Sequence, residues 1–259
     1  LCVRVNALKG KNRQEVIAEL KESFPEGQDQ IFETKISPIG IILPRGSYLQ
    51  KHPLYLEGNV EIQDEGSQLL SYLADAKRGQ MVADFCAGAG GKTLHLASLM
   101  ENKGQLIAMD IYESKLKKLK IRARRNGVHN IDMKVIDSTK PIKKLYNKAD
   151  RVLIDAPCSG LGVLRRNPDA KWKLEPEFLD RIRGVQEDVL NQYSRIVKPG
   201  GKLVYATCSV LPSENQEQIK KFLDTELGKE FTFVKDKKIF AHESGYDGFY
   251  MALLERQIN

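Results

Sequence analysis

The sequence predicts an α/β protein whose main body is a doubly wound, mostly parallel sheet. From Ile62 onward, short apolar runs typical of buried strands alternate with longer runs that have the spacing of amphipathic helices. Repeated strand–helix units of this kind form parallel sheets and bind ligands above the carboxyl ends of the strands. A glycine-rich turn, several aspartates and two cysteines directly follow the predicted strands. We therefore expect the chemistry of this protein at one edge of the sheet.

The composition is that of an ordinary globular protein with a basic surface. The chain has 259 residues, 41% of them hydrophobic and 29% charged, enough for one large domain with a small appendage. No run approaches the roughly 18 apolar residues of a membrane span, and no signal-peptide pattern opens the chain. The formal net charge of +7 indicates a polyanionic partner, since Lys and Arg displace counterions from phosphates. Many basic proteins bind no nucleic acid, so this charge alone does not decide.

The four cysteines, Cys2, Cys86, Cys158 and Cys208, lie far apart in the sequence. Their spacing matches neither a metal site nor a dense disulfide framework. We therefore expect free thiols, a cytoplasmic setting and no bound metal. The chain begins within a predicted strand, from which we expect a further domain upstream.

Residues 1–60 are predicted to form a small α+β domain, and residues 61–259 the main domain. In the small domain, Cys2–Leu8 is a strand candidate, Arg13–Ser23 has an amphipathic helical pattern, and Ile31–Leu43 contains further strand material. The βαβ start is similar to that of an RNA-recognition domain. An aromatic pair on which bases would stack is not evident, however.

The main domain is predicted as alternating strands and helices. Strands are expected at Met81–Phe85, Gln105–Asp110, Asp132–Ile136, Arg151–Ile154 and Lys202–Ala206. Helices are expected at Ser67–Ala76, Lys92–Met100, Glu113–Asn126, within Pro176–Val197, and at Glu214–Leu223. The last two strands, Phe231–Val234 and Gly248–Leu254, are too close for a helical crossover, so they should form an antiparallel edge hairpin.

The glycine-rich turn after the first of these strands predicts a cofactor site. It consists of Cys86, Ala87, Gly88, Ala89, Gly90, Gly91 and Lys92. Glycines here let a ligand approach the backbone and let the next helix start sharply. The phosphate-binding pattern G-x-x-x-x-G-K-[ST] fails at Cys86, and the dinucleotide pattern G-x-G-x-x-G fails at Thr93. A nucleoside triphosphatase is therefore disfavoured.

Three aspartates follow successive predicted strands. Asp110 lies about twenty residues beyond the turn, where a carboxylate accepts hydrogen bonds from a ribose diol. Asp137 would receive an adenine amino group, and Asp155 would lie beside a methionine-like ammonium. Each of them alone would equally serve as a helix N-cap. Together, without a phosphate cradle, they predict a cationic adenosyl ligand, S-adenosylmethionine.

The two thiols that follow neighbouring strands predict covalent chemistry. Cys158 lies in the run DAPCSG at 155–160, and Cys208 in the run TCS at 207–209. If the two strands are parallel neighbours, the cysteine backbones lie about one strand spacing of 5 Å apart. A thiolate is the side chain best suited to attack an electron-poor ring carbon. The alternative for Cys208 is a buried cysteine that only packs at a strand end.

Taken together, these motifs resemble the Sun/Fmu family of RNA (cytosine-5)-methyltransferases. The resemblance spans most of the chain, through RVNAL at 4–8, EIQDEGSQ at 61–68, the glycine-rich turn, DAPCSG, TCS and DGFY at 247–250. RRNPDAKW at 165–172 looks most like the branch that modifies small-subunit ribosomal RNA. One departure is Ala89, where the family commonly has proline; it removes no ligand group.

The resemblance implies a Rossmann-like class I methyltransferase sheet, S-adenosyl-L-methionine as cofactor and a cytosine of 16S ribosomal RNA as substrate. Cys208 would add to C6 of the base, and Cys158 would assist product release. Chemistry alone leaves the reverse assignment open, because cytosine-5 enzymes acting on DNA use the cysteine of a Pro-Cys motif, which corresponds to Cys158. Asp155 would hold the cofactor ammonium or, when protonated, donate a hydrogen bond near N3 of the base. Lys92 would position an acidic residue or the cofactor carboxylate, and Cys86 is expected to pack.

The loop at 162–173, just after Cys158, is the predicted RNA contact. A target base has to leave its stack to reach a thiol in a crevice, and this loop should lie over that crevice. The loop carries cations and the only tryptophan, namely Arg165, Arg166, Lys171, Lys173 and Trp172. Trp172 as a structural anchor of the loop is the alternative. The basic helix Glu113–Asn126 spreads its charges around its axis, which favours a solvated surface.

We therefore expect a monomeric enzyme that methylates RNA and uses neither a membrane nor a metal. The same chemistry on transfer RNA is the alternative substrate. A catalytically idle RNA-binding factor in ribosome assembly is the alternative of another class. The presence of both cysteines together with the acidic set argues against the idle factor.

Overall fold

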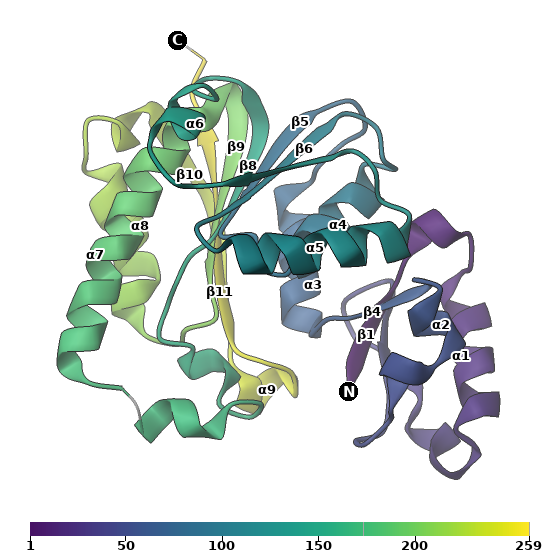
Figure 1. Ribbon diagram of the computed structural model, residues 1–259. Helices are drawn as coiled ribbons and strands as arrows, with labels where there is room; N and C mark the ends of the chain where they lie inside the picture. Colours follow the sequence, from purple (N-terminus) through teal and green to yellow (C-terminus); the bar gives the residue numbers. More distant parts are fainter. Residues whose placement is uncertain (173, 259) are drawn as a thin grey trace.

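The larger of two sheets has seven strands in the order β10-β11-β9-β8-β5-β6-β7 (Figure 1). In this computed structural model, residues 1–172 and 174–258 are described. The strands are β5 (Met81–Phe85), β6 (Gln105–Asp110), β7 (Ile131–Val135), β8 (Ala149–Asp155), β9 (Val197–Thr207), β10 (Phe231–Ile239) and β11 (Phe249–Arg256). Strands β5 to β9 pair in parallel, whereas β11 is antiparallel to both β9 and β10. The predicted parallel sheet with an antiparallel C-terminal hairpin is confirmed.

Helices cover both faces of this sheet. One face carries α3 (Glu65–Ala74), α4 (Gly91–Leu99) and α5 (Glu113–Asn126), and the other carries α6 (Lys140–Lys143), α7 (Pro176–Tyr193) and α8 (Gln216–Leu223). The strands serve both cores because successive side chains point to opposite faces. In β8, Val152 and Ile154 pack in the core with α7, while Leu153 packs in the core with α4 and α5. A strand buried on both sides explains the unbroken apolar run in the sequence.

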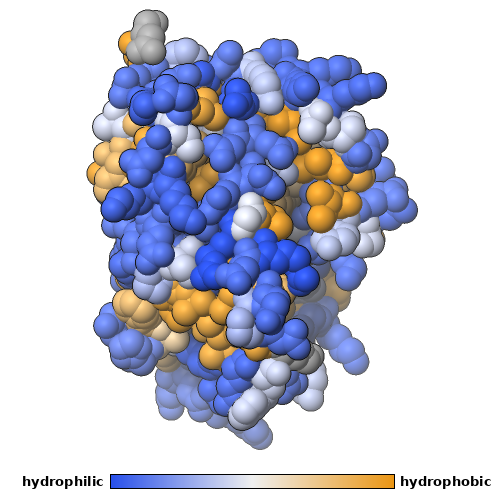
Figure 2. Space-filling view, turned by 90° about the vertical axis from the view of Figure 1, so that its left-hand side faces the viewer, coloured by the Kyte–Doolittle hydropathy of each residue, from blue (hydrophilic) through white to orange (hydrophobic). Residues whose placement is uncertain are grey.

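The surface on the side of α7 and α8 is largely polar (Figure 2). Hydrophobic patches lie on it at separate places. A short helix, α9 (Ala241–Ser244), joins β10 to β11. Among the helices formed by residues 1–172 and 174–258, none has the length and apolar character needed to cross a membrane.

The N-terminal unit has a four-stranded antiparallel sheet in the order β2-β3-β1-β4. Its elements are β1 (Cys2–Val5), α1 (Arg13–Ser23), β2 (Phe32–Glu33), β3 (Gly40–Ile42), α2 (Pro53–Leu56) and β4 (Val60–Ile62). This β-α-β-β-α-β arrangement is the split βαβ motif of ferredoxin-like and RNA-recognition-like domains. The expected boundary between residues 60 and 61 falls inside β4.

One face of this small sheet packs against the main domain and is closed to solvent there. Arg4 of β1 is fully buried, and its Nε donates to Gln63 Oε1 at 2.7 Å. The Glu61 carboxylate of β4 accepts hydrogen bonds from Arg122 and Asn126 of α5, each at 2.6 Å. Base stacking on a sheet surface requires an open face, so RNA cannot stack on this one.

Several element boundaries differ from the predicted ones, and the structure shows the reason for three of them. β1 stops at Val5 because the side chain of Asn6 accepts a hydrogen bond from the Leu8 N–H and caps a 3-10 turn. Strand β10 continues to Ile239, well past the predicted Val234, because it pairs with the whole length of β11. Helix α8 begins at Gln216, since Glu214 is turned into the interior.

Candidate active site

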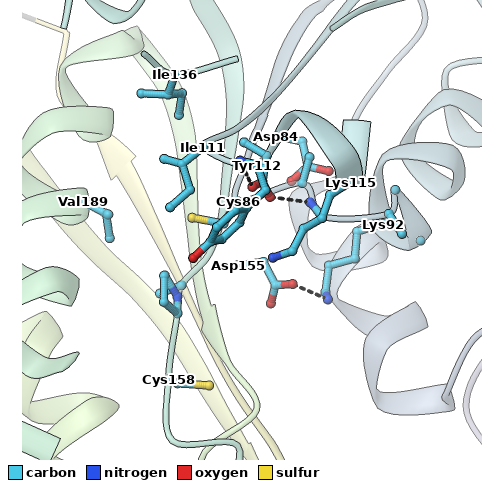
Figure 3. Close-up of a pocket in the computed structure, with 18 of the residues that line it drawn as sticks. Asp84, Cys86, Lys92, Ile111, Tyr112, Lys115, Ile136, Asp155, Cys158 and Val189 are labelled. Carbon is cyan, nitrogen blue, oxygen red and sulfur yellow. Dashed lines mark hydrogen bonds and ion pairs between the residues drawn. The ribbon is translucent and has the colours of Figure 1, made fainter. Parts of the chain in front are cut away.

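A cavity of about 660 Å³ lies at the carboxyl ends of the central strands (Figure 3). Most of the predicted site residues line it, namely the turn from Cys86 to Gly91, Lys92, Asp110, Asp155, Cys158 and Cys208. They come from the ends of four different strands, β5, β6, β8 and β9. Its volume is typical of sites that enclose a small organic ligand.

The glycine-rich turn has the backbone shape that its sequence requires. Cys86, Gly88 and Gly90 have φ angles of 60°, 59° and 86°, in the left-handed region. A Cβ atom at Gly90 would overlap the Leu119 side chain of α5, so only glycine lets the two segments approach. The turn therefore presents open backbone to the cavity at a fixed place.

Asp110 holds this turn against the end of β6. Its Oδ2 accepts a hydrogen bond from the Gly88 N–H, and its Oδ1 accepts one from the Tyr112 N–H, both at 2.8 Å. A carboxylate has about four lone-pair positions, so two remain available at the cavity wall. Two adjacent acceptors of this kind suit a vicinal diol.

Asp84 of β5 is a buried carboxyl group beneath the turn. Its Oδ2 accepts a hydrogen bond from Thr93 Oγ1 at 2.6 Å, and the residue is fully buried. Burial raises the pKa of Asp84 to about 7, from its ordinary value of 3.8. The group therefore exchanges a proton close to neutral pH.

We expect Asp84→Asn to remove part of the pH dependence of stability. Because its pKa is raised in the folded state, Asp84 contributes stability that is complete below about pH 4 and is lost as the pH rises through about 7. Asparagine keeps an acceptor for Thr93 but does not titrate. At pH 8 the variant should have the larger free energy of unfolding, by an amount on the order of 4 kcal/mol. Urea unfolding at pH 4 and pH 8 measures the difference, and an equal loss of stability in both proteins would contradict the assignment.

Lys92 and Asp155 form an ion pair across the cavity, with Nζ 2.6 Å from Oδ2 (Figure 3). Their side chains are 14% and 28% exposed. Burial alone would lower the pKa of Lys92, but the Asp155 carboxylate outweighs it, and the pKa of Lys92 is raised. The pair thus keeps an ammonium in the same cavity as the thiols.

The two predicted thiols lie together. The sulfur atoms of Cys158 and Cys208 are 3.3 Å apart, because β8 and β9 are parallel neighbours and end side by side. The hydrogen bond between them lowers the pKa of Cys208 and raises that of Cys158, and the Lys92 ammonium also lowers the pKa of Cys208. Cys208 is thus the more readily ionised sulfur, and once ionised it can only accept the hydrogen bond from Cys158.

The backbone after Cys158 is tied directly to the Cys208 loop. The Gly162 N–H donates to Cys208 O, and the Gly248 N–H donates to Gly162 O, both at 2.8 Å. A Cβ atom at Gly162 would overlap Gly248 O. The start of the RNA-contact loop predicted at 162–173 is therefore held by backbone hydrogen bonds to the loop that carries Cys208.

Two arginines of this loop are engaged within the protein. Arg166 pairs with Asp247, which is fully buried, and Arg165 lies 3.8 Å from Asp247 and 3.9 Å from Asp64. Trp172 is 80% exposed, so it does not anchor the loop by burial. RNA contacts of these residues stay a prediction. Lys171 places its Nζ 4.8 Å from the Trp172 ring centre, and the predicted Lys173 lies outside the described residues.

Asp137 is the predicted cofactor residue that does not line the cavity. It is exposed just beyond β7, where Ser138 Oγ donates to its Oδ1 at 3.1 Å. The preceding residue, Ile136, lines the cavity instead. A role of Asp137 in binding adenine stays a prediction.

Sequence reasoning missed the apolar part of the cavity. Ile111 and Tyr112 extend the wall beyond Asp110, and the cationic Lys115 lies next to them. Helix α7 contributes a stripe formed by Ile182, Val185, Val189 and Tyr193. The helical spacing of this stripe was the signal that could have identified it. In the part of the chain that the structure describes, no group of three or more His, Cys, Asp or Glu residues could hold a metal ion.

Comparison with known proteins gives a consistent result. The family model described as 16S rRNA methyltransferase RsmB/F matches residues 71–255. A Bacillus subtilis relative, "Probable ribosomal RNA small subunit methyltransferase B", is 34% identical and aligns with 98% of this chain and 59% of its own length. The Vibrio cholerae "Ribosomal RNA small subunit methyltransferase B" is 37% identical, over 79% of this chain and 48% of its own length. The chain thus spans about half to three fifths of the length of these relatives.

Two solved structures share the architecture. A "Methyltransferase Homolog Protein" from Pyrococcus horikoshii has a TM-score of 0.84 at 26% identity, covering 98% of this chain and 86% of that one. The NSun6 protein of Pyrococcus horikoshii, solved with SFG, has a TM-score of 0.87 at 20% identity, covering 100% of this chain and 91% of that one. The second likeness shows the fold alone.

Proposed function

We propose, because this chain belongs to the RsmB/F family of 16S rRNA methyltransferases, that it transfers a methyl group from S-adenosylmethionine to C5 of a cytosine in 16S ribosomal RNA. The observation that carries the cytosine-5 chemistry is the pair of thiols, 3.3 Å apart, in the same cavity as the glycine-rich turn. A nucleophile is needed because C5 of cytosine does not by itself attack a methyl donor. Ribosomal RNA as substrate would place the protein in the cytoplasm.

The cavity fits an adenosyl ligand in its donor set. Asp110 offers acceptors for a ribose diol, Ile111 and Ile136 offer apolar surface for an adenine ring, and Asp155 offers a carboxylate for an ammonium. Lys92 would hold the ligand carboxylate or keep Asp155 in place. Membership of a methyltransferase family supports this ligand class. When bound, S-adenosylmethionine supplies an electrophilic methyl group.

Cys208 acts as the nucleophile in this proposal. Its thiolate forms a bond to C6 of cytosine, and the electrons of the C5=C6 double bond move to make C5 nucleophilic. Asp155, when it carries a proton, would donate a hydrogen bond near N3 of the base and so stabilise the adduct. After C5 is methylated, its proton passes to a base, the double bond re-forms and Cys208 leaves as a thiolate. Cys158 assists this release by donating its proton towards the departing sulfur.

The RNA would be held by the loop over the cavity and by the N-terminal domain, residues 1–60. The exposed Trp172 and its neighbour Lys171 offer a ring and a cation to an unstacked strand. Arg165 and Arg166 lie against Asp247, so an RNA phosphate would contact them only on the side that faces solvent. The closed sheet face of the small domain leaves its outer surfaces as the RNA-facing part.

Incubation with unmodified 16S ribosomal RNA and labelled S-adenosylmethionine tests the proposed function. We expect one labelled cytosine, which nuclease digestion and mass spectrometry would identify as 5-methylcytosine. Label in transfer RNA instead would replace the proposed substrate, and label at a position other than C5 would overturn the chemistry. Calorimetry with the cofactor alone provides the control, because absence of binding would reject the ligand itself.

A further inference from the structure

Glu214 is a fully buried glutamate beside the thiol pair, and the chemistry above does not use it. Its Oε1 accepts hydrogen bonds from the Ser159 N–H at 2.8 Å and from Gln186 Nε2 at 3.1 Å. Its Oε2 accepts hydrogen bonds from Ser159 Oγ at 2.5 Å and from Ser209 Oγ. Four donors fill the lone-pair positions of one carboxylate. Each oxygen of this carboxyl group therefore accepts two hydrogen bonds.

The two serines that it binds are the residues directly after the two cysteines. Ser159 follows Cys158 on the β8 loop, and Ser209 follows Cys208 on the β9 loop. Their own Oγ atoms are 3.1 Å apart. One carboxylate thus clamps both loops at the positions next to the sulfur atoms. No other contact between the loops involves a buried carboxylate in the described residues.

Further hydrogen bonds hold Glu214 and the residues around it in place. Glu214 O accepts a hydrogen bond from the Tyr205 hydroxyl at 2.8 Å, which fixes the residue against β9. The next residue, Asn215, donates from Nδ2 to Ser209 O at 3.0 Å. On the other loop, Gln186 Nε2 also donates to Pro157 O at 2.8 Å. Movement of Glu214 would therefore move both cysteine loops.

We propose that Glu214 is a positioning residue that sets the distance between the two thiols. Its importance for methyl transfer rests on the proposed function, but its effect on the thiols does not. Without the carboxylate, the donors on the two loops lose their shared acceptor and the loops separate. A thiol pair that is out of place by about 1 Å is expected to slow a positioned reaction by about 100-fold.

Glu214→Gln tests this role with measurements that do not depend on RNA. We expect iodoacetamide to alkylate Cys208 at a higher pH than in the wild type, because the hydrogen bond from Cys158 is weakened. We expect the Cys158–Cys208 disulfide to be disfavoured by at least about tenfold in a glutathione redox buffer, since its formation reports the proximity of the sulfurs. Peptide mass spectrometry assigns both changes. If methylation is observed, its kcat should fall about 100-fold while the KM for S-adenosylmethionine stays the same.

Asp150→Asn is the matched control. Asp150 lies at the opposite end of β8, where it accepts a hydrogen bond from the Met81 N–H and pairs with Lys198. The Asp150→Asn variant should have a lower free energy of unfolding, but the pH dependence of Cys208 alkylation and the disulfide equilibrium should not change. If Glu214→Gln does not fold, Ser209→Ala removes a single donor and should shift both readings in the same direction by a smaller amount. Wild-type thiol behaviour in the folded Glu214→Gln or Ser209→Ala protein would overturn the role, whether or not the chain methylates RNA.

Discussion

Cys208→Ala is expected to abolish methyl transfer, with a loss on the order of 10⁴-fold or more. The variant keeps the glycine-rich turn and the Lys92–Asp155 pair, so binding of S-adenosylmethionine should remain within a few-fold of wild type. Without the nucleophile, C5 of the base is not activated and no adduct forms. Single-turnover methylation of the RNA measures the loss, and calorimetry checks the bound cofactor. Methylation at near wild-type rate would refute Cys208 as the nucleophile.

The Cys158→Ala variant distinguishes the roles of the two sulfur atoms. It leaves the nucleophile in place but removes the hydrogen-bond donor 3.3 Å from it. We expect a covalent protein–RNA complex to accumulate, visible as a shifted band in a denaturing gel, because release becomes slow. Cys2→Ala is the control: Cys2 lies in the small domain, and burial raises its pKa to about 12. If the trapped complex instead appears with Cys208→Ala, the two roles are reversed.

The parallel core of the fold was predictable because each element carries a local signal. Met81–Phe85, Gln105–Asp110 and Glu113–Asn126 have the predicted limits, since the glycine-rich turn, Asp110 and Gly127 mark where they stop. The position of β11 between β9 and β10 was not predictable. It depends on long-range pairing that the local sequence pattern does not encode.

The site was predictable where motif residues follow strands, and less so where tertiary contacts decide. Cys158 and Cys208 meet because their strands are neighbours, which the alternating pattern implies. The burial of Asp247 against Arg166 could not be foreseen, because the two residues are 81 positions apart in the sequence. Glu214 looked like the first residue of a helix. Only the folded loops show that its carboxylate belongs to the site.

Lys92→Met is expected to weaken both stability and the reactivity of the thiol. Removing one member of a partly buried ion pair leaves the Asp155 carboxylate without its cation, which costs up to about 3 kcal/mol. The pKa of Cys208 should rise, because the Lys92 ammonium lowers it and the Asp155 carboxylate raises it. At neutral pH the thiolate fraction and the methylation rate should therefore fall together. Urea unfolding and the pH profile of Cys208 alkylation measure the two effects.

The double variant Lys92→Met/Asp155→Asn distinguishes electrostatics from simple packing damage. Replacing both members of a buried pair is often close to neutral for stability, so we expect most of the lost unfolding free energy to return. Methylation should not return, because both groups proposed to hold the cofactor are gone. Lys117→Met, whose side chain is 69% exposed and paired with Glu113 on α5, is the control for loss of a lysine. Because the ion pair and the thiols share one cavity, a Lys92→Met protein with an unchanged Cys208 pH profile would show that the ammonium does not act on the sulfur.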